Sequence, residues 1–250
     1  MEREFDKKVA VITGAASGMG LLTSQELVKR GASVVMVDIC KEALDKTATE
    51  IDPSGEHVLP IVCDVRRYEE VEGVAKAALD AFGRIDILVT FAGGAEARCC
   101  NSHHPFYEQP IEVIDWAIDV NLKGAVYFSR ACMPTMIKQN SGVIITLGSV
   151  TGIEGCASST CYGASKSGLF GFTKGLARAG GPHNVRACCV SPGPVLTRPG
   201  MAAMPTILGR AAQPIEIVNL ILFLCSEKGA FVTGTNYIID GGHTVYNQTY

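Results

Sequence analysis

The stretch from Val9 to Gly20 constrains this chain more than any other part of its sequence. The apolar run Val9 to Ile12 predicts a strand that is buried on both faces. Thr13 to Gly20 follows at once with three glycines, and Leu21 to Arg30 has the pattern of a helix. Glycine lets the backbone turn tightly and approach a ligand, and the free amides at a helix start suit a pyrophosphate.

A second predicted strand supports a dinucleotide site at this turn. Ser33 to Val37 forms this strand, and Asp38 ends it 18 residues after Gly20. A carboxylate about 20 residues beyond the turn can bind the hydroxyls of the adenine ribose. A tight turn with only a structural role is the alternative, and it leaves the place of Asp38 unexplained.

Length and composition favour one globular domain, residues 1–250. The chain is long enough for a sizeable core, and 47% of its residues are hydrophobic. A net charge of -3 without a basic block argues against nucleic-acid binding. Met1 to Lys8 is charged and unlike a secretory signal, and no apolar run approaches the roughly 18 residues of a membrane span. We therefore expect a soluble, cytoplasmic protein.

The ten cysteines do not form an obvious metal site. No pair has Cys-x-x-Cys spacing, so we interpret most as small buried hydrophobic residues that are kept reduced. The segment Cys99 to His104 is the one cluster that suggests a metal, but adjacent residues cannot easily bind one ion. We expect no metal and interpret this segment as a loop near the substrate entrance.

Strand and helix patterns alternate along the rest of the chain. Further strands are predicted over 57–63, 85–91, 142–147, 185–190 and 236–239, and helices over 41–51, 68–82, 111–138, 160–179 and 214–225. This alternation predicts an α/β fold of the doubly wound Rossmann type, with a central parallel sheet of about seven strands and helices on both faces. We expect the helix over 111–138 to be interrupted near Asn121 and before Pro134, and serines to cap the helix that starts at Thr160.

Tyr162, Lys166 and Ser149 form the second chemical signal. Tyr162 and Lys166 are four residues apart on a predicted helix and therefore share a face. The ammonium group and the helix N-terminus would both lower the pKa of the phenol from its usual value of about 10. Ser149 ends the preceding strand and could hydrogen-bond a substrate oxygen. Such a Tyr-x-x-x-Lys pair also occurs on ordinary solvated helices.

Together these motifs resemble the short-chain dehydrogenase/reductase family over essentially the whole chain. The matching residues are Thr13 to Gly20, Asp38, Asp64-Val65, Ala92-Gly93, Asn121, Ser149, Tyr162 to Lys166, Pro192-Gly193 and Asp240-Gly241-Gly242. Ser149 and Tyr162 are thirteen residues apart, as in the family.

The resemblance implies an NAD-dependent oxidoreductase and gives roles to these residues. Tyr162 would exchange the proton with an alcohol or ketone, Ser149 would polarise its oxygen, and Lys166 would bind the nicotinamide ribose. Asn121 would hold a water molecule that links Lys166 to solvent, with a simple helix kink as the alternative. The implied cofactor-binding residues are Gly14, Ser17, Gly18, Met19, Gly20, Asp38, Ile39, Asp64, Val65, Phe91, Ala92, Gly93, Tyr162, Lys166, Pro192, Gly193, Val195 and Thr197.

Two segments depart from the family pattern. Thr90-Phe91 stands where the family usually has two asparagines, and we expect backbone contacts to hold the cofactor there instead. The segment 197–213 is shorter than the usual substrate lid and largely apolar. With Ile153 and the loop from Ala95 to Phe106 it suggests a pocket for an alicyclic or steroid-like substrate. A lid that packs only on its own protein is the alternative.

The leading prediction is an enzyme that transfers a hydride between NAD and a secondary alcohol or ketone. A 3-oxoacyl-thioester reductase is the alternative among enzymes, weakened by Asp38 and by the lack of a basic patch. A non-catalytic dinucleotide-sensing protein on the same fold is disfavoured by the intact Ser149, Tyr162 and Lys166.

The two long helices, 111–138 and 160–179, carry apolar residues beyond one stripe. On the second helix these include Leu169, Phe170, Phe172 and Leu176. A helix that is apolar over most of its circumference needs more than one partner. Together with the resemblance, this pattern predicts a homotetramer.

Overall fold

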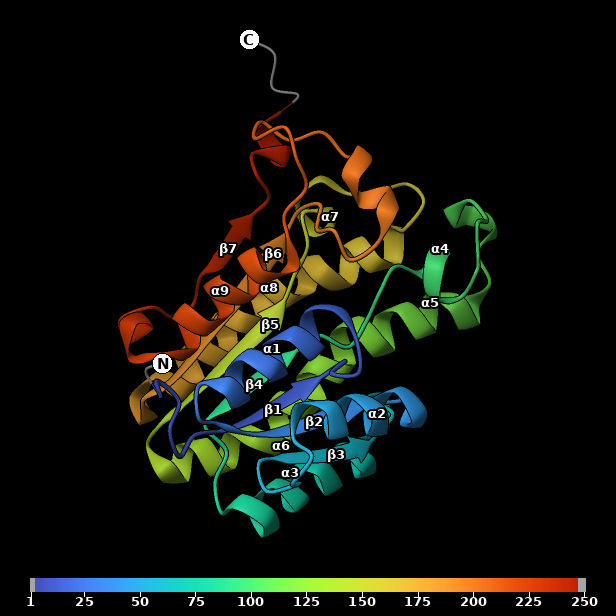
Figure 1. Cartoon of the computed structure of the whole chain (residues 1–250). Helices are drawn as coiled ribbons and strands as arrows, with labels where there is room; N and C mark the ends of the chain where they lie inside the picture. Colours follow the sequence, from blue (N-terminus) through green and yellow to red (C-terminus); the bar gives the residue numbers. More distant parts are fainter. Residues whose placement is uncertain (1–2, 247–250) are drawn as a thin grey trace.

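One parallel seven-stranded sheet forms the centre of the computed structural model, which describes residues 3–246 (Figure 1). The strand order is β3-β2-β1-β4-β5-β6-β7, and every neighbouring pair is parallel. The strands are β1 (Val9–Thr13), β2 (Ser33–Asp38), β3 (Val58–Val62), β4 (Ile87–Thr90), β5 (Gly142–Leu147), β6 (Val185–Pro192) and β7 (Asn236–Ile239). The predicted fold class is confirmed.

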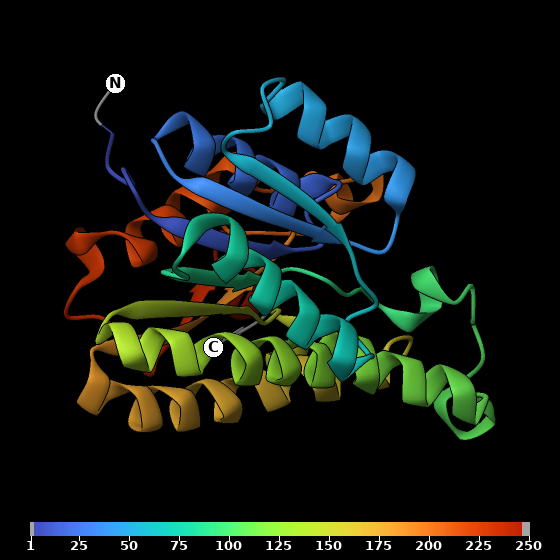
Figure 2. The ribbon, with the colours of Figure 1, turned by 90° about the horizontal axis from the view of Figure 1, so that it is seen from below.

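Helices cover both faces of the sheet. The main helices are α1 (Gly18–Lys29), α2 (Lys41–Ile51), α3 (Tyr68–Phe82), α5 (Ile111–Ile118), α6 (Gly124–Gln139), α8 (Thr160–Gly180) and α9 (Pro214–Cys225). Short turns of helix are α4 (Glu96–Cys99), η1 (Phe106–Glu108), α7 (Thr151–Glu154), η3 (Gly181–His183), η4 (Pro199–Ala203), η5 (Glu227–Gly229) and η6 (His243–Val245). Figure 2 shows α5, α6 and α8 as long helices along one face, with α1 and α2 on the opposite face. No helix within residues 3–246 is long and apolar enough to cross a membrane.

The apolar runs in the sequence reflect burial on both faces of the sheet. In β1, Ala10 and Ile12 pack into the core under α1, α2 and α9, whereas Val11 packs into the core under α3, α6 and α8. A strand between two such cores cannot alternate polar and apolar residues. This is why Val9 to Ile12 reads as a continuous apolar segment.

The strand order places a crevice between the carboxyl ends of β1 and β4. The chain leaves β1 toward α1 and β2 on one side, and it leaves β4 toward α4 and β5 on the other. Open α/β sheets bind ligands where such connections diverge. Figure 1 shows α4 and α7 at this same edge.

The prediction for the helix over 111–138 was only partly correct. The interruption near Asn121 is confirmed, because a π-helical turn, η2 (Asp119–Lys123), separates α5 from α6. The expected break before Pro134 is wrong, since α6 continues through it to Gln139. Pro134 lies on the exposed face of α6, where water can bond the carbonyl that loses its partner, while Cys132 and Met136 keep the inner face packed.

Candidate active site

The turn between β1 and α1 is shaped by glycine. Gly14 has a φ of +66°, and a Cβ at this position would lie 2.9 Å from the amide nitrogen of Ala92. A Cβ on Gly20 would lie 2.2 Å from the carbonyl oxygen of Gly14, so the helix start can pack on the turn only with glycine. Ser17 precedes α1 and makes no side-chain capping bond. The first amides of α1 are therefore available to an anion.

A first cavity of about 440 Å³ opens beside this turn. It brings together twelve of the predicted cofactor-binding residues: Gly14, Ser17, Gly18, Met19, Gly20, Asp38, Ile39, Asp64, Val65, Phe91, Ala92 and Gly93. This cavity combines the close-packed glycine turn, the free amides at the start of α1 and a carboxylate. These features fit the adenosine and pyrophosphate parts of a dinucleotide.

The Asp38 carboxylate is held in place by main-chain amides. One oxygen accepts a hydrogen bond from the Ala16 amide at 3.0 Å and the other accepts from the Cys40 amide at 3.0 Å. Arg66 also lines the first cavity, but its guanidinium donates three hydrogen bonds of 2.6–3.0 Å to Asp64. Lys41 is exposed and pairs with Asp45. Lys41 and Arg66 are thus already paired with other carboxylates.

A second cavity of about 420 Å³ contains the predicted catalytic group. Its lining includes Ser149, Tyr162, Lys166, Pro192, Gly193, Val195 and Thr197. The two cavities share Met19, Phe91, Gly93 and Arg98, so they form one continuous cleft. All the predicted site residues except Asn121 line this cleft.

Burial dominates the electrostatics of Tyr162. It raises the pKa of the phenol, while a hydrogen bond with Ser149 and the positive charges of Arg198 and Arg98 act in the opposite direction. The sequence argument expected a net lowering, and within this chain that expectation is wrong because desolvation of the phenolate outweighs these effects. The amide of Thr151 donates to Ser149 Oγ at 3.1 Å and thereby fixes the serine hydroxyl.

Lys166 is buried beneath Tyr162. Its Nζ donates to the carbonyl oxygen of Leu147 at 2.6 Å and lies 5.5 Å from the centre of the Tyr162 ring. Burial lowers the pKa of Lys166 to about 8. The ammonium therefore sits at the end of β5, between the main chain and the phenol, and can exchange its proton close to neutral pH.

Asn121 lies behind the site and does not line either cavity. Its Oδ1 accepts from the amide of Gly94 at 2.8 Å, and its Nδ2 donates to the carbonyl oxygens of Gly94 and Ala117 at 3.0 and 2.9 Å. The side-chain amide thus ties the segment after β4 to the π-helical turn. A water molecule between Asn121 and Lys166 stays a prediction.

The start of α8 is capped by a residue that the sequence did not suggest. Ser159 makes no capping bond, so the expected serine cap is wrong. Instead, the Glu96 carboxylate accepts from the amides of Cys161 at 2.9 Å and Tyr162 at 3.2 Å, and only 2% of Glu96 is exposed. An acceptor 65 residues away leaves no local sequence signal. The charged lining residues Arg98 and Arg198 were also not selected, because nothing in their sequence neighbourhood marks them.

The departure at Thr90-Phe91 is compensated by neighbouring groups. The amide of Ala92 donates to Thr13 Oγ1 at 3.1 Å, and Asn121 holds Gly94, so the segment after β4 remains fixed. Thr90 is buried, and its hydroxyl has no hydrogen-bond partner among residues 3–246. Phe91 lines both cavities.

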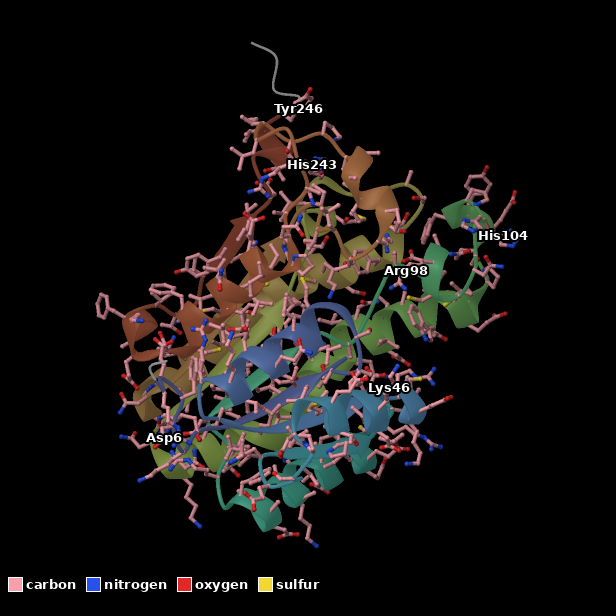
Figure 3. All side chains as sticks on the ribbon, in the orientation of Figure 1. Asp6, Lys46, Arg98, His104, His243 and Tyr246 are labelled. Carbon is pink, nitrogen blue, oxygen red and sulfur yellow. The ribbon has the colours of Figure 1, made fainter. Side chains whose placement is uncertain are left out.

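The Cys99 to His104 segment shows no metal-binding geometry. No group of three or more His, Cys, Asp or Glu side chains in the described part of the chain could hold an ion. Cys99 lines the first cavity, and Figure 3 shows His104 at the outer end of the loop, with Arg98 on its inner side. All ten cysteines are free thiols.

The fold and the cleft define a dinucleotide-dependent oxidoreductase, and comparison with known proteins agrees. The model of the short chain dehydrogenase family matches residues 8–206, and the chain belongs to this family. Its members are oxidoreductases that act on alcohols and ketones with NAD or NADP.

Relatives and a solved structure resemble the chain over nearly its full length. A 7alpha-hydroxysteroid dehydrogenase of Bacteroides fragilis is 31% identical, with 98% of this chain and 97% of the relative covered. A 3-oxoacyl-(acyl-carrier-protein) reductase of Thermotoga maritima is 36% identical, with 95% and 98% covered. A short-chain dehydrogenase/reductase structure from Brucella melitensis has a TM-score of 0.86 at 31% identity, with 97% and 98% covered.

Proposed function

We propose that this enzyme transfers a hydride between NAD and a secondary alcohol or the corresponding ketone. The observation that carries the proposal is the placement of Ser149, Tyr162 and Lys166 in the second cavity, which is continuous with the first cavity, where Asp38 lies. Ser149, Tyr162 and Lys166 would handle a hydroxyl or carbonyl oxygen. Asp38 would recognise a ribose that has no phosphate.

NAD would lie along the whole cleft and supply the hydride-accepting nicotinamide. The start of α1 would bind its pyrophosphate, and the Asp38 carboxylate would accept hydrogen bonds from the adenine ribose. Asp64 and Val65 would contact the adenine. Pro192 to Thr197 would border the nicotinamide, and Lys166 its ribose.

The residues around the substrate oxygen would then manage one proton. Ser149 Oγ accepts from the Thr151 amide, so its own hydrogen can point to a substrate oxygen. Tyr162 hydrogen-bonds Ser149 and has a raised pKa, so it is protonated at neutral pH and can donate to a ketone. Lys166, with a pKa near 8, lies behind the phenol and can pass a proton onward.

The segment 197–213 is proposed as a lid over the substrate within a single domain. Met201 and Met204 line the second cavity and give it an apolar wall. Ile207, Leu208 and Ile153 are exposed side chains outside this lining. The proposed pocket is therefore partly hydrophobic, but fewer of these apolar residues line it than the sequence suggested.

A 3-oxoacyl-thioester reductase remains the second candidate, because the Thermotoga maritima relative carries that name. A panel of alcohols separates the two candidates: hydroxysteroids, alicyclic alcohols, hydroxy acids and 3-hydroxyacyl thioesters, each offered with NAD and with NADP. Formation of the reduced cofactor is followed at its absorbance band. We expect turnover with NAD and a secondary alcohol. No turnover across the panel with either cofactor would refute the proposal and favour a dinucleotide-sensing role.

Assembly as a homotetramer and a cytoplasmic location are part of the same proposal. Leu169 and Leu176 are buried in the chain's own core, and Phe170 and Phe172 are half-buried, so these side chains need no second chain to cover them. The exposed positions of α8 include Gly171 and Gly175, which allow a close helix approach. The ten free thiols agree with a reducing compartment.

A further inference from the structure

The second cavity carries positive charge without a matching negative charge. Among residues 3–246, its charged lining residues are Arg98, Lys166 and Arg198, and no Asp or Glu of this part of the chain lines it. Lys166 is bonded to the Leu147 carbonyl. Within residues 3–246, neither guanidinium, of Arg98 or of Arg198, forms an ion pair or a side-chain hydrogen bond. The two groups therefore have all their donors available.

The two arginines come from different segments, and both line the cavity that contains Tyr162. Arg98 belongs to α4, and Figure 3 shows it on the side of α4 that faces the rest of the chain. Arg198 directly follows Thr197 at the start of the lid segment. Both positive charges act to lower the pKa of the Tyr162 phenol, which lines the same cavity.

Nearby carboxylates are not available to neutralise them. Glu96 is two residues from Arg98, but its carboxylate is buried and bonded to the start of α8. Asp38 and Asp64 share the first cavity with Arg98, but Asp38 accepts from the Ala16 and Cys40 amides and Asp64 is paired with Arg66. Two guanidinium groups in one cavity without a paired carboxylate favour an anion, and the forked geometry of a guanidinium suits a carboxylate.

We propose that Arg98 and Arg198 form a subsite for a carboxylate on the substrate. This deepens the proposed function and rests on it, because it names the substrate of the same site: a small hydroxy acid and the corresponding oxo acid. The apolar lining by Val150, Met201 and Met204 would contact the hydrocarbon part between the carboxylate and the hydroxyl. The cavity of about 420 Å³ must also take the nicotinamide, which keeps the substrate small.

Arg198 gives the cleaner test of the two arginines. Arg98 lies where the two cavities meet, so it could also reach a cofactor phosphate. Arg198 lines only the second cavity. A role of Arg198 in binding the cofactor alone is the competing explanation.

The test measures binding of matched ligands to the full-length Tyr162→Phe chain saturated with NAD, so that no turnover occurs. The ligands are 4-hydroxycyclohexanecarboxylate and 3-hydroxybutanoate, each compared with its neutral carboxamide by calorimetry. We expect at least one carboxylate to bind about 10- to 100-fold more tightly than its amide, as charge-assisted hydrogen bonds allow. Arg198→Met should remove this difference. Lys76→Met, which removes an exposed positive charge from α3 outside both cavities, should leave it unchanged.

Several outcomes would overturn the subsite. Equal binding of acid and amide, binding of neither, or an acid-to-amide ratio unaffected by Arg198→Met would each do so. Loss of NAD affinity in Arg198→Met with the ratio preserved would assign the arginine to the cofactor instead. Failure of the proposed function looks different: in the alcohol panel, no compound would be oxidised, charged or neutral. If neutral alcohols are oxidised at a rate that Arg198→Met does not change, the proposed function stands and the carboxylate subsite is rejected.

Discussion

Replacing Glu96 should disturb both the stability of the chain and the position of Tyr162, the proposed catalytic tyrosine. The carboxylate accepts from the amides of Cys161 and Tyr162, in the first turn of α8. Glu96→Ala leaves these buried donors without their acceptor and removes a negative charge from the positive end of the helix dipole. Glu96→Gln keeps one acceptor oxygen and loses only the charge.

The expected magnitude follows from these two contributions. Loss of a helix N-cap costs about 1–2 kcal/mol, and a partly buried charge at a helix end contributes up to about 2 kcal/mol. We expect Glu96→Ala to lower the free energy of unfolding by about 2–3 kcal/mol, or the melting temperature by roughly 5–10 °C for a chain of this size. Glu96→Gln should lose about half as much, because the cap bond is partly retained.

Glu96→Ala should also slow turnover, because it would displace the Tyr162 phenol. A displacement of the phenol by about 1 Å can reduce turnover by as much as roughly a hundredfold. We expect kcat with the best alcohol of the panel to fall about tenfold or more in Glu96→Ala, assayed well below its melting temperature, and to recover largely in Glu96→Gln. Glu56→Ala, at an exposed position before β3, serves as the matched control.

Hydrogen exchange provides a readout that needs no substrate. In Glu96→Ala the amides of Cys161 and Tyr162 should exchange faster than in the original chain, while those in the middle of α8 should not change. Unchanged exchange at these two amides, together with a melting temperature within about 1 °C of the original, would refute the capping argument.

Four further predictions follow from the site. Tyr162→Phe should abolish turnover while NAD still binds, which calorimetry and initial rates can check; more than a few per cent of residual rate in a folded variant would contradict its role. NAD should be preferred over NADP by at least about a hundredfold in kcat/KM, since each 1.4 kcal/mol of repulsion from Asp38 is a factor of ten; Asp38→Ser with Ile39→Arg should shrink or reverse this preference in steady-state kinetics. Burial lowers the pKa of Lys166 from 10.5 to about 8, so at this residue the unfolded chain binds more protons between these pH values, and the contribution of Lys166 to stability should rise with pH there; urea unfolding at pH 7.5 and 10 should show a more positive change in stability for the original chain than for Lys166→Met, and an equal change in both would refute it. Light scattering at micromolar concentration should give the mass of a tetramer, and a monomer would reject the proposed assembly.

The parts of the fold that local patterns control were predictable from the sequence. Continuous apolar runs such as Val9 to Ile12 gave the strands, because both faces of the sheet are buried. The helix starting at Pro214 was predicted with its observed bounds, since proline suits the first turn and the apolar run ends at Cys225. Pro134 was misjudged because its effect depends on whether the freed carbonyl meets water, and the sequence does not state which face is exposed.

The site was predictable where its residues lie in motifs, and not where they act over distance. Gly14, Ser17 to Gly20, Asp38, Ser149, Tyr162 and Lys166 come together in one cleft, as their motifs indicated. Glu96 was missed because a capping acceptor 65 residues away has no periodicity or spacing to reveal it. The balance of effects on the pKa of Tyr162 was also missed, since desolvation depends on packing in three dimensions.

The strand order has a mechanical consequence for the cleft. Strands β1, β2 and β3 lie on one side of the boundary between β1 and β4, and all the later strands lie on the other. The first cavity draws its carboxylates from the early side, whereas the second draws its hydroxyls and cations from the late side. A dinucleotide that fills both cavities would contact residues on both sides of this boundary. It would therefore resist any motion of one side relative to the other. A mononucleotide would contact one side only and would not oppose such a motion.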